Sequence, residues 1–567
     1  MQNRLFPRLA LAVVLCLAAL GAPAVQAAPH RALRHGMVVA ANPLAAEAGL
    51  RVLQAGGDAA DAAVAVQAVL GLVEPQSSGV GGGAFMVFYD AKTHKVTAYN
   101  GREAAPAGAT PDFFLKPDGT PMPFFEAILS GRSTGPPGAL ALLGAVQAQH
   151  GAKPWSSLFG YAEGLARDGF QVSPRLAGFV NAPFPQARAP DVLAYFTKPD
   201  GTEVKAGDVL KNPAYAKTLQ AIAAGGARAL NEGPIAADIA RRVQRDPGGV
   251  LTTDDLAAYK AKVSDALCRP YRAYVVCVPP SPSGGPALLE MLGLLQRTDI
   301  ERRGPDDAKA WFEMAQAMRL TYADRDRYLG DPAFVAEPVE GLLSDAYLDQ
   351  RAKLIGEMAG PAPEPGTPPG APAPGGDSTR EAGGTSHFVV ADRQGNVVSM
   401  TTSVESVFGS GRMVDGFVLN NQLTDFAFLP KDKAGRPAAN AVAPGKRPRS
   451  AMTPVIVLTR SGKFFAAVGS PGGPAILAYD LKALVGVLDW KLSMQKAVAL
   501  PNVIALGDRF NGETALFPPA VLKDLAARGV SLSTGRGENS GLHGVTARDG
   551  TLEGGADPRR EGVALRD

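Results

Sequence analysis

The chain has 567 residues, of which 46% are hydrophobic and 20% are charged, and its formal net charge is +3. This composition is typical of globular proteins, and the length is enough for one large body or several domains. A nearly neutral chain excludes a whole-protein positive field that would attract nucleic acid. The short basic run of Lys446, Arg447 and Arg449 is therefore interpreted as solvated surface.

The first residues indicate a targeting signal. Arg4 and Arg8 precede an apolar run over 9–20, and the small residues at 25–27 suit a signal peptidase. The apolar run is short for a membrane span, and no later segment is long enough either. We expect residues 1–27 to be removed and the mature protein to be periplasmic or secreted, with no membrane span.

Two helices and a strand are predicted next along the chain. The first helix is expected over 43–55, with Asn42 as its N-cap, and the second over 58–73. A glycine turn at 79–83 then precedes an apolar strand that ends near residue 89. More helices are expected within 155–260 and over 307–325.

The clearest low-complexity segment is the Pro/Gly/Ala tract over 359–376, which is predicted to be extended and mobile. Soon after Gly383 and Gly384, the sequence TSHFVVADRQGNVVSMTTSV predicts a strand, a turn and a second strand. SAMTPVIVLT and KFFAAVGS predict further strands. The mixture of helices and strands indicates an α/β or α+β fold.

Thr385 stands at the junction between this tract and the first of those strands. A threonine hydroxyl needs an adjacent base to act as a nucleophile, and the α-amine of an N-terminal threonine, with a pKa of about 8, supplies one. Exposing that amine requires cleavage between Gly384 and Thr385, and the two glycines permit the backbone distortion that an attack would need. The residues alone leave two interpretations open: a cleaved junction with a nucleophile, or a structural threonine at a strand start.

Ser133 offers a second hydrolytic motif. GRSTG, over 131–135, satisfies the pattern of a nucleophile elbow, which requires a helix directly after the serine. Pro136 and Pro137 follow instead and favour a loop. A third interpretation is a non-enzymatic periplasmic binding protein in which the Pro/Gly tract is a hinge.

Two cysteines remain after the predicted leader, Cys268 and Cys277. They flank RPYRAYVV, which leaves open a disulfide across a hairpin or two free thiols. There is no metal-binding motif, so we expect no metal and no cofactor.

Beyond these motifs, TSHFVVADRQGNVVSMTTSVESVFGSG resembles the start of the small subunit of γ-glutamyltranspeptidases, which are N-terminal-nucleophile hydrolases. GGDAADAAVAVQAVLGLVEPQSSGVGGGAFM, KRPRSAMTP and GSPGGPAI are similar in the same order, so the resemblance covers essentially the whole mature chain. It implies an α+β fold, the four-layer αββα sandwich, built jointly by a large subunit, 28–384, and a small subunit, 385–567. Both would come from one self-cleaved precursor, with 359–384 as linker, and form a heterodimer.

The resemblance also implies an activity and catalytic roles. A γ-glutamyl group would pass from glutathione or a similar amide to water or to an amino acid or peptide acceptor, without a cofactor. Thr385 would be the nucleophile, with the Ser403 hydroxyl hydrogen-bonded to it. Gly472 and Gly473 would supply the backbone N–H donors of an oxyanion hole. Gly384 and Thr385 would flank the cleavage site.

The same resemblance implies a pocket for the zwitterionic head group of the substrate. Arg102 would bind the α-carboxylate, and three residues would surround the α-ammonium: Glu405, Gln422 and Asp425. A zwitterion needs a cation and an anion in a closed pocket, which fits this set. Taken singly, Arg102 beside Glu103 is also compatible with a surface ion pair, and Asp425 with a turn residue.

The sequence departs from the family at two places near this pocket. Ser450 and Ala451 stand where the family often has two serines that contact the α-carboxylate. The segment that follows Phe428 and runs to Ser450 has no aromatic residue, whereas members with a lid carry a tyrosine there. We therefore expect an open site, and related acylases acting on glutaryl or poly-γ-glutamyl substrates remain the alternative.

Overall fold

The computed structural model describes residues 33, 35–377, 379–535 and 540–567. The predicted leader, 1–27, lies outside the described residues. Within the described ranges, no helix combines the length and apolar character that a membrane span requires.

The described elements are seventeen α-helices and nineteen strands, together with short 3₁₀ turns. The helices are α1 (Pro43–Gln54), α2 (Ala59–Val73), α3 (Phe124–Leu129), α4 (Ala139–His150), α5 (Gly160–Asp168), α6 (Pro174–Val180), α7 (Pro190–Phe196), α8 (Pro213–Gly225), α9 (Gly233–Gln244), α10 (Thr253–Ala258), α11 (Gly285–Leu295), α12 (Ala308–Tyr328), α13 (Val339–Leu342), α14 (Asp345–Ala352), α15 (Ile476–Leu488), α16 (Met494–Ala499) and α17 (Pro519–Ala527). The strands are β1 (Met37–Ala40), β2 (Gly83–Asp90), β3 (Lys95–Asn100), β4 (Phe170–Gln171), β5 (Val209–Leu210), β6 (Lys262–Asp265), β7 (Leu267–Tyr271), β8 (Tyr274–Val278), β9 (Thr385–Ala391), β10 (Val397–Ser403), β11 (Met413–Val414), β12 (Phe417–Val418), β13 (Val455–Thr459), β14 (Phe464–Gly469), β15 (Val503–Leu506), β16 (Arg509–Gly512), β17 (His543–Arg548), β18 (Thr551–Ala556) and β19 (Val563–Arg566).

Two large antiparallel sheets face each other at the centre of the unit. The first has seven strands in the order β19-β1-β9-β10-β2-β3-β6, and the second has six in the order β18-β17-β14-β13-β8-β7. Alternate side chains of the facing strands, such as Val389, Ile456 and Val545, form one apolar layer between the sheets.

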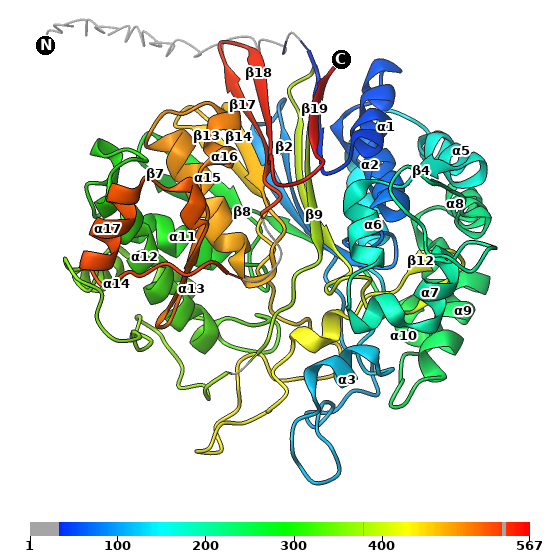
Figure 1. Cartoon of the computed structure of the whole chain (residues 1–567), viewed down its shortest axis with the longest axis horizontal. Coiled ribbons are helices and arrows are strands. Elements are labelled where there is room, and N and C mark those ends of the chain that lie inside the picture. The colour runs from blue at the N-terminus through cyan, green and yellow to red at the C-terminus, as the bar shows by residue number, and fades with distance from the viewer. Residues whose placement is uncertain (1–32, 34, 378, 536–539) are drawn as a thin grey trace, which may run out of the picture. The chain divides into compact units, whose positions relative to one another are not determined.

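Helices cover the outer face of each sheet, as Figure 1 shows. The apolar core of the first sheet is shared with α1, α2 and α4, and that of the second sheet with α11, α12 and α15. The order helix, sheet, sheet, helix confirms the predicted αββα sandwich. The second sheet takes strands from both sides of residue 385, so the segments 28–384 and 385–567 build the sandwich jointly.

Local sequence signals account for the first helices. The Asn42 side chain accepts a hydrogen bond from the Leu44 N–H at 3.0 Å, and α1 ends one residue before Ala55, its C-cap. Asp58 and Asp61 form a capping box at the start of α2. Both helices lie where the sequence predicted them.

None of the described residues of the Pro/Gly tract belongs to a helix or strand, and the tract makes a turn in which the Ala371 N–H donates to the Pro368 carbonyl at 3.0 Å. Its middle is tied to α12: the Gly366 N–H donates to Asp324 Oδ1 at 2.6 Å, and the Tyr328 hydroxyl donates to the Gly366 carbonyl at 2.6 Å. That the tract moves remains a prediction.

Two further expectations concern charged and sulfur-containing residues. Cys268 and Cys277 are register partners on β7 and β8 and form a disulfide, so they are not free thiols. The prediction that Lys446, Arg447 and Arg449 form solvated surface is wrong, because all three are buried. Acceptors from distant parts of the chain satisfy the arginines there, as when Arg447 Nη2 donates to the Lys260 carbonyl at 2.7 Å.

Candidate active site

Thr385 is the first residue of β9 and pairs in register with Ser403, the last residue of β10. Side chains alternate along a strand, so Thr385 lies on the same face of β9 as Val389, which packs between the sheets. The Thr385 hydroxyl lies 3.1 Å from Ser403 Oγ, and Thr385 is 3% exposed. The hairpin therefore brings together the predicted nucleophile and its predicted partner.

Ser403 also contacts the peptide bond that precedes Thr385. Its hydroxyl donates to the Gly384 carbonyl at 2.8 Å, and its oxygen accepts the Glu405 N–H at 2.8 Å. A hydroxyl has one proton to donate, so with Gly384 as acceptor, Ser403 Oγ accepts from Thr385. One side chain thus connects the attacking oxygen with the carbonyl that it would attack.

Close backbone packing fixes the segment before Thr385. A Cβ on Gly384 would lie 2.4 Å from the Glu405 carbonyl oxygen, so only glycine fits. The turn that carries Gly472 and Gly473 packs against the same segment at Ala382. A Cβ on Gly473 would lie 2.5 Å from the Ala382 carbonyl oxygen. The structure therefore places this turn against the segment before Thr385, while its role as oxyanion hole remains a prediction.

The glycine turn at 79–83 packs against the same site. A Cβ on Gly82 would lie 2.1 Å from the Ser403 carbonyl oxygen, and one on Gly81 would lie 2.1 Å from the Val418 carbonyl oxygen. Gly82 thus lets the backbone approach the end of β10 closely, and Gly81 does the same at β12.

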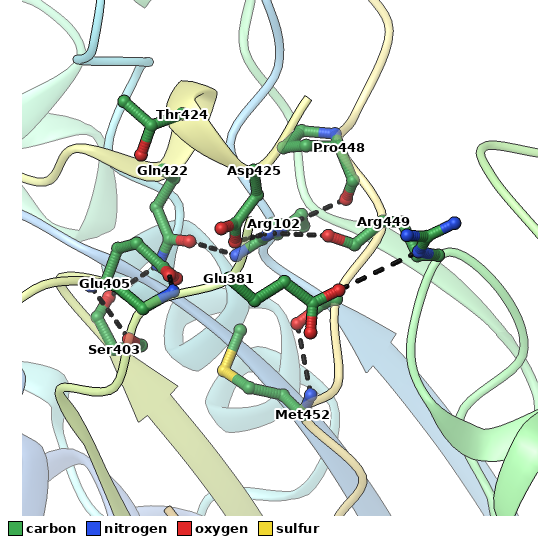
Figure 2. Close-up of polar contacts among 12 residues, drawn as sticks. Arg102, Glu381, Ser403, Glu405, Gln422, Thr424, Asp425, Pro448, Arg449 and Met452 are labelled. Atoms are coloured by element: carbon green, nitrogen blue, oxygen red, sulfur yellow. Dashed lines mark hydrogen bonds and ion pairs between the residues drawn. The ribbon is translucent and has the colours of Figure 1, made fainter. Parts of the chain in front are cut away.

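Arg102 is fully buried and lies at the centre of a polar cluster, shown in Figure 2. Its Nη2 lies 2.5 Å from Asp425 Oδ2, and its Nη1 donates to Gln422 Oε1. The carbonyls of Pro448 and Arg449 accept from the same guanidinium at 3.2 and 2.9 Å. Arg102 is therefore not part of a surface ion pair, and it contacts Asp425 directly instead of facing it across a pocket.

Glu405 and Asp425 lie close to this guanidinium, and Glu381 lies close enough to Asp425 to raise its pKa. Burial raises the pKa of Asp425 to about 6, against the opposing effect of Arg102. Burial also raises the pKa of Glu405 well above its usual range, and Asp425 raises it further. An added cation such as an ammonium would relieve this crowding of negative charge.

Ser450 and Ala451, the pair that stands where the family often has two serines, are both buried next to this cluster. Ser450 Oγ accepts the Met452 N–H at 3.1 Å, and Ala451 packs against Phe85 and Met452. The hydroxyl of Ser450 is thus engaged with the backbone in this structure.

Ser133 is not a nucleophile in this structure. Its hydroxyl is fully buried and donates within its own turn, with the Ile128 carbonyl 2.7 Å away. Loop residues follow it before α4 begins, so the strand–turn–helix of an elbow is missing there.

Sequence reasoning missed several residues of the site. Arg560, from the far end of the chain, donates to the Thr385 carbonyl at 3.1 Å. Glu103 is buried beside Gly83 and Gly135, and burial raises its pKa to about 8. Glu381 was also passed over, although its position four residues before Thr385 was a usable signal. Within the described ranges, no group of three His, Cys, Asp or Glu residues could hold a metal ion.

A four-layer αββα sandwich with a threonine at the start of a central strand is the architecture of N-terminal-nucleophile hydrolases. The γ-glutamyltranspeptidase family model matches residues 45–566. The glutathione hydrolase proenzymes of Bacillus subtilis (strain 168) and Escherichia coli (strain K12) are each 36% identical over 553 residues, covering 94% of this chain and 91% of the relative. The chain belongs to the γ-glutamyltranspeptidase family and is an enzyme.

A solved structure has the same fold as this chain over nearly the whole length of the chain. The cephalosporin acylase from Bacillus halodurans superposes with a TM-score of 0.83 at 27% identity, covering 97% of this chain and 99% of that one. The family architecture is therefore common to glutathione hydrolases and an acylase.

Proposed function

We propose that this enzyme cleaves itself between Gly384 and Thr385, and that it then transfers γ-glutamyl groups from glutathione and related amides to water or to amino acid and peptide acceptors. The observation that carries the proposal is the contact of the Ser403 hydroxyl with both Thr385 Oγ1 and the Gly384 carbonyl. The names of the Bacillus subtilis and Escherichia coli relatives support the choice of glutathione.

Self-cleavage begins when Thr385 Oγ1 attacks the carbonyl carbon of Gly384. The hydroxyl proton leaves toward Ser403, and Ser403 stabilises the charge that develops on the carbonyl oxygen, 2.8 Å away. The C–N bond breaks, the nitrogen of Thr385 takes up the proton that left Thr385 Oγ1 by way of Ser403, and Gly384 becomes esterified to Thr385. Water then hydrolyses the ester, which releases the Gly384 carboxylate and regenerates the threonine hydroxyl beside a free α-amine.

In the cleaved enzyme that α-amine is the base. It accepts the proton of Thr385 Oγ1 as the oxygen attacks the γ-amide carbon of the donor, and it passes the proton to the leaving amine. The backbone N–H groups of Gly472 and Gly473 would bind the oxyanion. The acyl-threonine ester then passes to water or to an amino acceptor, which loses one proton to the same amine.

The buried cluster around Arg102 fits the head group of a γ-glutamyl donor. Arg102 and Asp425 form an ion pair, with Nη2 and Oδ2 2.5 Å apart. A zwitterion can replace this internal pair with two external ones, its carboxylate on Arg102 and its ammonium on Asp425, Glu405 and Gln422. Ser450, next to the buried methyl of Ala451, would contribute one hydroxyl at the carboxylate end.

We further propose that 1–27 is a removable leader, that the mature enzyme is periplasmic or secreted, and that fragments 28–384 and 385–567 remain together as a heterodimer. The shared sandwich supports the last point, because neither fragment contains a whole second sheet. Each fragment alone would expose an apolar sheet face.

A glutaryl acylase is the second candidate, favoured by the similarity to the cephalosporin acylase and by Ala451. A glutaryl group lacks both charges of the head group, so it would leave Arg102 and Asp425 paired with each other. We expect glutaryl-p-nitroanilide to be a much poorer substrate than γ-glutamyl-p-nitroanilide. Equal rates with the two donors would contradict the γ-glutamyl proposal and favour the acylase.

A further inference from the structure

One carboxylate just before the proposed cleavage site is enclosed by two buried arginines. The Glu381 side chain is 6% exposed, and its Oε1 lies 2.5 Å from Arg325 Nη2 and 3.7 Å from Arg449 Nε. Figure 2 shows the Glu381 side chain between Arg449 and the cluster around Arg102. A charge in such an environment is costly unless it is paired, so the two arginines determine where Glu381 lies.

The arginine pair is held both by α12 and by the segment that carries Glu381. Arg325 belongs to the last turn of α12 and contacts Asp326 Oδ1 at 3.0 Å. Arg449 contacts the same Asp326 oxygen at 3.2 Å and Asp377 at 2.8 Å. Since α12 is packed into the core of the second sheet, it fixes Arg325, and Asp326 on the same helix holds Arg449 beside it.

The pair also has donor capacity for a whole carboxylate. Within the described residues, the buried Nε atoms of Arg325 and Arg449 have no hydrogen-bond acceptor, and Glu381 Oε2 has no donor. Both oxygens of a carboxylate can therefore be satisfied at this site by small side-chain rotations.

Hydrogen bonds also hold the residues between Glu381 and the scissile carbonyl. The Ala382 N–H donates to Glu405 Oε1 at 3.1 Å, and the Gly384 carbonyl accepts from Ser403 at 2.8 Å. Three residues span at most about 11 Å, so holding Glu381 restricts where the Gly384 carbonyl can lie.

We propose that Arg325 and Arg449 form a carboxylate-binding site for Glu381, and that this contact positions the Gly384 carbonyl for attack by Thr385. The inference rests on the self-cleavage proposed above. Glu381 exchanges no proton and forms no bond in the reaction, so it is a positioning residue. Its contribution ends when the bond before Thr385 is broken.

The test follows pulse-labelled precursor as it separates into two fragments. Glu381→Gln and Arg325→Gln should each slow the separation by about 10- to 100-fold, the loss expected for a charge-assisted hydrogen bond. Glu381→Asp, which keeps the charge on a shorter arm, should recover part of the rate. Arg380→Gln is the matched control, because Arg380 is the exposed neighbour of Glu381 and should cleave at the wild-type rate.

Two readouts separate positioning from a general loss of stability. The double variant Glu381→Gln/Arg325→Gln should be no slower than the slower single variant, because both remove the same contact. In the Thr385→Ala background, where the precursor stays one chain, Glu381→Gln should leave the far-UV and near-UV circular dichroism unchanged, so that slow cleavage cannot be attributed to loss of the fold.

Cleavage of Glu381→Gln at the wild-type rate, or additive slowing in the double variant, would overturn the inference. Since Glu381 belongs to no helix or strand, its variants test the inference even if Arg325→Gln fails to fold. A wild-type precursor that never cleaves would contradict the proposed function instead, which keeps the two failures distinct.

Discussion

The Ser403 hydroxyl donates a hydrogen bond to the Gly384 carbonyl at 2.8 Å, across the end of the hairpin that also carries Thr385. This contact polarises one particular peptide bond in the chain, the one whose cleavage would free the α-amine of Thr385. Removing the Ser403 hydroxyl should therefore slow the self-cleavage of the precursor.

Ser403→Ala removes both the donor to Gly384 and the acceptor for Thr385. We expect precursor cleavage to slow by about 100- to 1,000-fold, the cost of deleting one oxyanion donor. Ser403→Thr keeps a hydroxyl and should process at close to the wild-type rate. Time-resolved denaturing electrophoresis measures both, and a Ser403→Ala precursor that matures normally would show that the contact has no role.

Gly384→Ala should block processing for a steric reason. The new Cβ would lie 2.4 Å from the Glu405 carbonyl oxygen, so the segment must shift away from Ser403. A displacement of this size costs on the order of 100-fold in rate. Gly376→Ala is the control, since a Cβ there meets nothing within 4 Å and its cleavage should be unchanged. Equal rates for the two variants would contradict the packing argument.

Arg102→Ala and Asp425→Ala should each mature but lose γ-glutamyl turnover. Removing one member of a buried ion pair leaves the other unpaired, at a cost of about 2–5 kcal/mol. This corresponds to a loss of roughly 30- to several-thousand-fold in kcat/KM. Asp200→Ala removes an exposed carboxylate and should have no effect. Steady-state kinetics with γ-glutamyl-p-nitroanilide would contradict the head-group assignment if either buried variant kept wild-type kcat/KM.

The pH dependence of turnover should report two groups. The Thr385 α-amine must be neutral, with a pKa of about 8, and Asp425 must be ionised, with its pKa raised by burial to about 6. Lowering the pH protonates both, so kcat/KM should fall about tenfold per unit below pH 8 and more steeply below pH 6. Asp425→Asn should lose the steeper limb. An unchanged profile in that variant would show that Asp425 does not titrate in turnover.

Much of the fold was predictable because local signals agree with the tertiary structure. Asn42 and Asp58 cap the helices that the sequence predicts, and the alternation in β9 and β10 predicts the hairpin that aligns Thr385 with Ser403. The roles of these residues came from resemblance, since a strand-start threonine has no distinctive local signal.

The environment of Arg449 could not be predicted in the same way. A basic run in a turn-rich segment is usually solvated, but Asp326 and Asp377 approach Arg449 from parts of the chain far away in sequence. Arg560, which contacts Thr385 from the far end of the chain, was missed for the same reason. Contacts over such distances are set by the packing of the sandwich and leave no periodicity in the sequence.

The N-terminal sequence of the smaller fragment tests the central claim most directly. Purified wild-type protein, with no added protease, should give two fragments, and the smaller should begin Thr385-Ser386-His387, while Thr385→Ala should remain one chain. A smaller fragment with a different first residue, or a Thr385→Ala protein that matures to the same two fragments, would contradict the assignment of Thr385 as the nucleophile.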